Sequence, residues 1–224
     1  MSLYTIAIIG GTGPQGSGLG YRFAMAGHCV VLGSRTPERA VSVAAELAAR
    51  LPSGARISGA ENLKAAEAAD LLVIAVPFKG HREIVGSLRS QAAGKTVVSC
   101  VNPLGFDKDG PYGLKVEEGS AAEQAADLLP EAKVVGAFHH VSAVTLLGEI
   151  DLLTHEDVLV CGDDQEAKGI VVDLAAAITG KPGIDAGRLR LARQLEPLTA
   201  VLISINKRYK VHSGVAIAGL PAYG

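Results

Sequence analysis

Short apolar runs alternate along this chain with longer stretches whose apolar residues recur every three or four positions. The runs are almost continuously apolar, as strands of a parallel sheet are when both of its faces are covered. Six of them predict strands at residues 6–9, 29–32, 70–77, 95–99, 133–138 and 158–161, with shorter strands expected at 56–58 and ending at Ile184. The stretches between them have helical spacing. This alternation predicts an α/β fold with a Rossmann-type, doubly wound, mainly parallel sheet.

The pattern changes near residue 187. From 188 to about 210 the apolar residues follow helical intervals, and they are Leu191, Leu195, Leu198, Leu202 and Ile205. Pro197 should kink or divide this helix, because proline disrupts the preceding turn. We therefore predict a Rossmann-type domain over residues 1–187 and a small C-terminal helical region over 188–224. The apolar seam is too large for a lone surface helix, so we expect it to pack on the body or on a second subunit, as a homodimer.

Two segments between the later strands have their own signals. Residues 105–119 are polar and punctuated by glycine, which predicts a loop. Ser120 precedes an apolar-periodic stretch and has Glu123 three positions on, which is a capping box and predicts a helix from there to Leu129.

The first strand ends in a glycine-rich turn. Residues 10–16 read GGTGPQG and contain G-x-G-x-x-G at Gly11, Gly13 and Gly16. A strand precedes the motif and a helical stretch follows it, which is the context that makes this pattern specific. The glycines permit a tight turn, let backbone approach a pyrophosphate, and let the helix lie close to its strand. The helix N-terminus offers free amides to that anion. We predict a dinucleotide site here.

The end of the second strand indicates which dinucleotide. An NAD site usually has Asp or Glu about 20 residues past the glycines, where it binds the ribose hydroxyls. Here Ser34 and Arg35 stand at the strand end, and Arg39 follows one helical turn later. A guanidinium suits a phosphate because its planar fork donates two parallel hydrogen bonds. We therefore predict NADP, with Glu38 inside the next helix and not in the place of the ribose-binding acid.

Composition and charge narrow the class of protein. The sequence contains no run of about 18 apolar residues and does not start with a secretory signal, so we expect a cytoplasmic protein without membrane partners. Cys29, Cys100 and Cys161 are widely separated, which predicts reduced thiols and no metal site. Residues 181–224 hold seven Lys and Arg against two Asp and Glu, a balance of +5 that favours an anionic ligand. The acidic remainder and the few aromatics argue against nucleic acid.

No familiar proton-transfer set accompanies the expected nicotinamide. None of the five tyrosines has Lys four residues later, as short-chain dehydrogenases require, and the residues after 185 are too few for a hydroxyacid-dehydrogenase substrate domain. His139 and His140 follow the strand at 133–138 and are the best polar candidates. Adjacent residues of a strand point to opposite faces, so the pair is not expected to bind metal. A hydride acceptor that is itself a cofactor would need only orientation.

The chain resembles the F420H2:NADP oxidoreductases, NADP-dependent reductases of the deazaflavin coenzyme F420. The resemblance extends from Ile6 through Tyr209 and rests on several separated segments in order, which is far more specific than the glycine motif alone. The segments are IGGTG at 9–13, GH at 27–28, GSR at 33–35, VP at 76–77, CGDD at 161–164, DAG at 185–187 and LEPLT at 195–199.

The resemblance implies reversible hydride transfer between NADP(H) and coenzyme F420. It implies that His139, Val141 and Thr199 line a deazaflavin cleft between the Rossmann body and the C-terminal helices. The residues expected to bind the cofactors are Gly11, Thr12, Gly13, Gln15, Gly16, Ser34, Arg35, Arg39, Val76, Pro77, Phe78, Asn102 and Pro103. The anionic tail of coenzyme F420 would suit the basic C-terminal end.

Other functions stay open on sequence alone. One is an NADP-dependent reductase of a small carbonyl or imine. Another is a non-enzymatic NADP(H) sensor, since a similar glycine turn occurs in redox-sensing Rossmann proteins. The same Rossmann type also serves flavin-dependent metal reductases, but those need a membrane heme domain, for which this sequence has no apolar run. The partners expected are small-molecule cofactor substrates.

Overall fold

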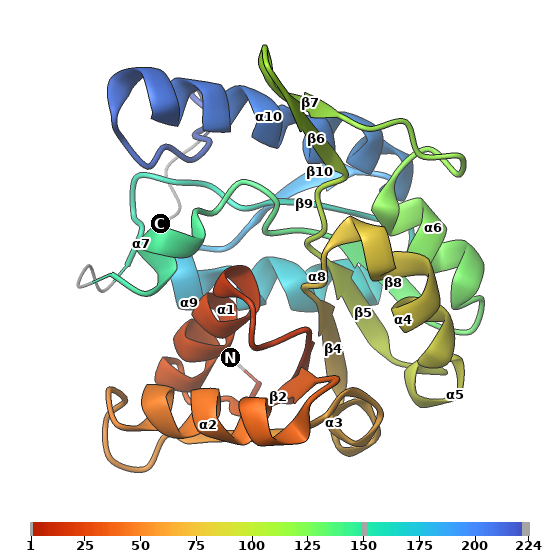
Figure 1. Cartoon of the computed structure of the whole chain (residues 1–224), viewed down its shortest axis with the longest axis vertical. Coiled ribbons are helices and arrows are strands. Elements are labelled where there is room, and N and C mark those ends of the chain that lie inside the picture. Colours follow the sequence, from red (N-terminus) through yellow and green to blue (C-terminus); the bar gives the residue numbers. More distant parts are fainter. Residues whose placement is uncertain (1, 149–151, 221–224) are drawn as a thin grey trace.

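The apolar runs form one eight-stranded sheet in a computed structural model that describes residues 2–148 and 152–220 (Figure 1). The strand order is β10-β9-β8-β5-β4-β1-β2-β3, and all pairs are parallel except β8 with β9. The strands are β1 (Thr5–Ile9), β2 (Cys29–Ser34), β3 (Arg56–Glu61), β4 (Leu71–Ile74), β5 (Thr96–Ser99), β8 (Lys133–Gly136), β9 (Leu159–Gly162) and β10 (Ile184–Gly187). The Rossmann-type, mainly parallel sheet is confirmed.

Side chains alternate between the two faces of the sheet, and each face has its own apolar core. Ile6 and Ile8 belong to one core, whereas Ala7 and Ile9 belong to the other. The helices that contribute to the first core are α1 (Pro14–Met25), α2 (Pro37–Ala48), α7 (Ala143–Leu146), α8 (Gln165–Leu174) and α9 (Ala176–Thr179). Those of the second core are α3 (Asn62–Ala68), α4 (His81–Ser87), α5 (Arg89–Ala92), α6 (Ala121–Leu128) and the start of α10 (Ala192–Tyr209). Burial on both faces explains the continuously apolar runs.

The prediction of a loop over 105–119 is wrong for most of residues 105–113. Strands β6 (Leu104–Asp107) and β7 (Gly110–Gly113) pair there as an antiparallel hairpin, which extends beside the last helix in Figure 1. The Asp107 carboxylate accepts hydrogen bonds from the N–H groups of Asp109 and Gly110, and Gly110 has φ +122°. This Asx-type turn closes the hairpin.

The last helix, α10 (Ala192–Tyr209), follows a short 3-10 turn, η2 (Leu189–Leu191). It runs uninterrupted through Pro197, so the expectation that proline divides it is wrong. Pro197 lacks the N–H for one helical bond, and its ring packs on the hairpin, because a Cβ built on Gly113 would lie 2.8 Å from the proline Cβ. Residues 78–92 form three short helical pieces in succession, namely η1 (Phe78–Gly80), α4 and α5.

The domain boundary predicted at residue 187 falls between β10 and η2, and it stays a prediction. Residues 221–224 of the expected C-terminal region lie outside the described part of the chain. No helix within that part has the length and apolar character needed to cross a membrane.

Candidate active site

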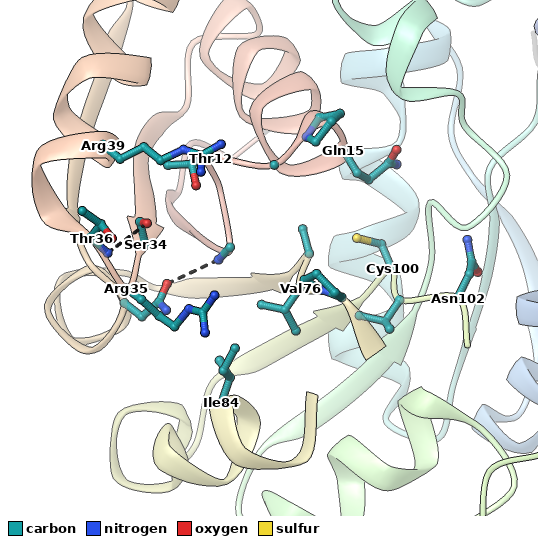
Figure 2. Close-up of a pocket in the computed structure, with 17 residues that line it drawn as sticks. Thr12, Gln15, Ser34, Arg35, Thr36, Arg39, Val76, Ile84, Cys100 and Asn102 are labelled. Carbon is teal, nitrogen blue, oxygen red and sulfur yellow. Dashed lines mark hydrogen bonds between the residues drawn. The ribbon is translucent and has the colours of Figure 1, made fainter. Parts of the chain in front are cut away.

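A cavity of about 470 Å³ lies at the carboxyl ends of β1, β2, β4 and β5 (Figure 2). Parallel strands end at one edge of a sheet, so residues far apart in sequence meet here. Most of the predicted cofactor-binding residues line it, namely Thr12, Gly13, Gln15, Ser34, Arg35, Arg39, Val76, Pro77 and Asn102. Figure 2 shows Arg35 and Arg39 at one end of the cavity and Gln15 and Asn102 at the other.

The glycine turn holds the N-terminus of α1 at this cavity. A Cβ on Gly11 would lie 2.8 Å from the Ile8 carbonyl oxygen, and one on Gly16 would lie 2.8 Å from that of Gly10. Only glycine allows these close approaches of backbone to backbone. Beside Gly13, which precedes the helix, the nearest such atom is 3.5 Å away, and no side chain caps the helix. The turn therefore presents uncapped helix amides to an anion.

The opposite end of the cavity is cationic. Arg35 and Arg39 are exposed, and neither forms an ion pair within residues 2–148 and 152–220. Ser34 is buried, and its hydroxyl accepts a hydrogen bond from the Thr36 N–H at 3.1 Å. The described residues that line the cavity include no Asp or Glu, and Glu38 lies within α2 as predicted. This end suits a phosphate rather than a ribose diol.

A second cavity of about 210 Å³ lies between the segment after β8 and helix α10. His139, Val141 and Thr199 all line it, so the structure brings these three predicted residues together across 60 positions of sequence. Gln15 and Asn102 line this cavity as well as the larger one. The two cavities therefore adjoin at these two side chains.

The His139 carbonyl oxygen is the hydrogen-bonding centre of the second cavity. It accepts one bond from Asn102 Nδ2 at 2.9 Å and another from Thr199 Oγ1 at 3.0 Å. The preceding residue, Phe138, has φ +63°, a left-handed conformation that is rare for a bulky side chain. Such outliers persist only where packing fixes them, and Phe138 is fully buried against Phe23. The unusual turn sets the direction of the carbonyl.

The His139 ring lies in the interior. It is 4% exposed, and its two nitrogens have no hydrogen-bond partner among the described residues. Burial, with a smaller contribution from His140, lowers the pKa of His139 to about 3, so the ring is neutral at physiological pH. A Cβ on Gly136 would lie 3.3 Å from its Cε1 and 2.9 Å from Cys161 Sγ, which places the ring over the sheet. The neighbouring His140 Nε2 bonds to the Leu195 carbonyl at 2.7 Å.

Some predicted residues lie elsewhere, and some lining residues were missed. Phe78 lines a separate hollow on η1 and α4, while Gly11, Gly16 and Pro103 are not among the lining residues of either cavity. Asn62 was missed, although it directly follows β3 at the same sheet edge, and its Oδ1 accepts from the Gly10 N–H at 3.3 Å. The residues missed along the larger cavity also include Thr36, Ile84 and Cys100.

Cys100 is not a nucleophile in this cavity. Its thiol donates to the Ile74 carbonyl, and burial raises its pKa to about 12. Over residues 2–148 and 152–220, no group of three or more His, Cys, Asp or Glu side chains is arranged to hold a metal ion.

The sheet order and the glycine turn define a Rossmann-type α/β protein of the class that binds dinucleotides. Residues 5–103 match the family model described as NADP oxidoreductase coenzyme F420-dependent. The chain is 38% identical to the F420-dependent NADP reductase of Methanocaldococcus jannaschii over 221 residues, 96% of this chain and 98% of that protein. It is 36% identical to the enzyme of that name from Methanothermobacter marburgensis over 227 residues, 96% and 99% of the two chains. The chain belongs to the family of F420-dependent NADP reductases.

Solved structures agree with this placement. A candidate F420-dependent NADP reductase from Arthrobacter sp. FB24 has a TM-score of 0.78 and 27% identity, with 96% of this chain and all of that chain covered. A reductive aminase from Aspergillus terreus shares the fold alone, with a TM-score of 0.64 and 20% identity over 93% of this chain and 63% of that one. The metalloreductase STEAP3 of Rattus norvegicus is 34% identical over 194 residues, 86% of this chain but only 36% of its own length.

The buried histidines should make a contribution to the stability of the fold that is lost in acid. Burial is the main cause that lowers the pKa of His28, His81, His139 and His140. Unfolded histidine binds a proton near pH 6.5, whereas the folded rings resist it, so their contribution to stability is present above that pH and lost below it. For His139 the loss continues to about pH 3. The histidines should therefore lower the melting temperature between pH 7 and pH 5, whereas Glu196, whose pKa burial raises to about 7, acts in the opposite direction over the same range.

The variant His139→Phe tests the largest of these contributions. Phenylalanine cannot titrate, so the slope of the melting temperature on going from pH 7 to pH 5 should be less negative than in the wild type. The exposed His212 provides the control substitution His212→Phe, which should leave the slope unchanged. An unchanged slope in His139→Phe would contradict the buried, neutral state of this ring.

Proposed function

We propose that this protein catalyses reversible hydride transfer between NADP(H) and coenzyme F420, the activity that the names of its full-length relatives state for them. The observation that carries the proposal is the pair of cavities that share Gln15 and Asn102. One has helix amides and two arginines for a phosphorylated dinucleotide. The other is smaller and uncharged, and it suits a planar ring placed against the nicotinamide.

The larger cavity would hold NADP by groups spread along its length. Arg35 and Arg39 would bind the 2′-phosphate together with Ser34, and the turn at Thr12 and Gly13 would bind the pyrophosphate. Asn102 Oδ1 is buried and has no hydrogen-bond partner among the described residues. An unmet buried acceptor is costly, and the carboxamide of a nicotinamide would supply the missing N–H.

The smaller cavity would hold the deazaflavin ring system. Val141, in the segment after β8, and Thr199, on α10, would contact it, and His139 would act through its carbonyl, which orients both Asn102 and Thr199. Val76 and Pro77 would form the apolar wall on the dinucleotide side. Gly11 and Gly16 would contribute by shaping the turn, while contacts from Phe78 and Pro103 stay predictions.

The hydride step would need positioning and no proton shuttle, and the proton that completes the reduced deazaflavin would come from water. A hydride carries its electron pair from the nicotinamide to the deazaflavin, so no side chain has to give or take a proton in that step. The His139 ring is buried and has a pKa of about 3, which makes it a poor acid or base at neutral pH. Holding the reacting carbons about 3–3.5 Å apart can supply a large part of the rate enhancement. Residues 188–224 would form the region that closes the deazaflavin cleft.

A cytoplasmic location is part of this proposal, because both co-substrates are small molecules of central redox metabolism. The direct test is to mix the purified protein with NADPH and oxidised coenzyme F420. Absorbance of the oxidised deazaflavin should disappear, and deuterium placed on the transferable position of NADPH should appear on the deazaflavin and not in water.

Other results of this experiment would decide against the proposal. Binding of NADPH without transfer to any acceptor would indicate a sensor. Turnover of a small imine or carbonyl, with no turnover of coenzyme F420, would favour the reductase alternative. Release of the deuterium to water would exclude direct transfer.

The preference for NADP should depend on Arg35. The variant Arg35→Ala removes a charged hydrogen bond to the 2′-phosphate, which should weaken NADP binding by about 1–3 kcal/mol. Binding and turnover with NAD should hardly change, since NAD has no phosphate there. Arg89 is also an exposed arginine but lies on α5, so Arg89→Ala is the matched control. Equal efficiency of the wild type with NADP and NAD would contradict the assignment.

We also propose a homodimer. Helix α10 buries its inner face but exposes apolar side chains on its outer one, with Val201 53%, Ile205 37% and Tyr209 68% exposed. A monomer would leave this face in water. Sedimentation should give a dimer mass, and Val201→Arg combined with Ile205→Arg should shift it toward the monomer. A wild-type mass that stays monomeric at all concentrations would refute the dimer.

A further inference from the structure

Glu196 is a buried carboxylate on an otherwise apolar face of α10. It lies in the LEPLT segment at 195–199, between Ala192 and Ala200, which are one helical turn away on either side and also buried. The residue is only 1% exposed. Burying a carboxylate is costly unless its oxygens are well hydrogen-bonded. Glu196 therefore needs partners, and it finds them on another helix.

The partners are the first two amides of α6. The N–H of Ala121 donates to one Glu196 oxygen at 2.7 Å, and the N–H of Ala122 donates to the other at 2.9 Å. The next two amides of α6 bond to Ser120, through its hydroxyl and its carbonyl. The bond to the carbonyl is the first one within the helix, so Glu196 satisfies the two donors in the first turn of α6 that Ser120 leaves unmatched. Burial raises the pKa of Glu196 to about 7, against the opposing effect of these two hydrogen bonds, and the ionised form places its charge at the positive end of the α6 dipole.

Glu196 stands within one turn of the contacts that α10 makes with the second cavity. Its neighbour Leu195 accepts the hydrogen bond from His140, and Thr199, three residues on, donates to the His139 carbonyl. Thr199 is therefore about 4.5 Å further along the helix axis. A shift or rotation of α10 at Glu196 would move the Thr199 hydroxyl by a similar amount.

We propose that Glu196 is a positioning residue for hydride transfer: its two bonds to the N-terminus of α6 fix α10 so that Thr199 meets the His139 carbonyl in the deazaflavin cavity. This inference rests on the proposed function for its kinetic consequence. Glu196 lines neither cavity, so it acts through Thr199 and not on the substrates.

A second link between α6 and α10 provides an internal control. Arg193 forms an ion pair with Glu123 across the same two helices. The Arg193 side chain is half exposed, and exposed ion pairs contribute little because water screens them. The two links join the same elements but differ in burial, so they separate a specific anchor from general helix contact.

The variant Glu196→Gln retains the shape of the side chain. Its amide has one oxygen to accept an N–H, and its NH2 group faces the other donor, so one bond is lost and a buried N–H is left unmatched. The KM for coenzyme F420 should rise about tenfold, the scale of one charged hydrogen bond. The KM for NADPH should stay within about twofold, because the larger cavity is not in contact with α10. Arg193→Gln should leave both KM values unchanged.

Coupling to Thr199 distinguishes positioning from simple loss of stability. If Glu196 acts through Thr199, then Glu196→Gln should add little to the effect of Thr199→Ala on the KM for coenzyme F420. Independent effects would instead multiply. Should Glu196→Gln fail to fold, Glu196→Asp keeps both oxygens on a chain one methylene shorter, and it should raise the same KM while sparing that for NADPH.

The outcomes separate the two proposals. A wild-type protein that does not reduce coenzyme F420 with NADPH would refute the proposed function. An active wild type with an unchanged KM for coenzyme F420 in Glu196→Gln would overturn the positioning role alone. Equal changes in both KM values, or multiplicative effects with Thr199→Ala, would likewise overturn it. A selective and non-multiplicative rise would support it.

Discussion

The structure depends on one constraint: a parallel sheet covered on both faces can expose function only at its edges. Ile6 and Ile8 face one core while Ala7 and Ile9 face the other, so β1 has no surface left for a ligand. Ligands must then bind beyond the carboxyl ends of the strands. Every contact described for the site, from the glycine turn after β1 to the His139 carbonyl after β8, lies at those ends.

The same constraint explains why the C-terminal helix needs a polar anchor. Helix α10 is not part of the sheet, so strand pairing does not fix its position. Apolar contacts hold it against the body but define its rotation and its place along the axis less closely. The hydrogen bonds that two amides of α6 donate to Glu196 are directional. They therefore fix both the rotation of α10 about its axis and its position along that axis. Burying a carboxylate costs free energy. Glu196 is buried one turn from Thr199, where the orientation of the helix matters for the second cavity, and not on the exposed part of α10.

The sequence predicts the sheet well because burial on both faces leaves a clear apolar signal at each strand. It also predicts that Ser34, Arg35 and Arg39 lie beside the glycine turn, because the carboxyl ends of neighbouring parallel strands meet at one edge of the sheet. Contacts that depend on tertiary packing are not visible in it. Periodicity cannot show that the left-handed turn at Phe138 sends the His139 ring inward and its carbonyl outward. The continuity of α10 through Pro197 likewise depends on the hairpin that packs against it. The anchor Glu196 is visible in the sequence, as a single acidic residue between Ala192 and Ala200 on an apolar face of the helix.

The two ends of the site differ in charge, and this difference bears on which end would affect KM and which would affect kcat. Arg35 and Arg39 stand at the far end of the larger cavity, while the described residues that line the smaller one carry no fixed charge. A 2′-phosphate does not change during hydride transfer, so its contacts stabilise the bound ground state and the transition state equally. Such uniform binding lowers KM and leaves kcat unchanged. Under the proposed function, the rate enhancement would then come from the uncharged end, where Asn102 and Thr199 both donate to the His139 carbonyl. The direction of net transfer would follow from the reduction potentials and concentrations of the two co-substrates, because a catalyst speeds both directions equally.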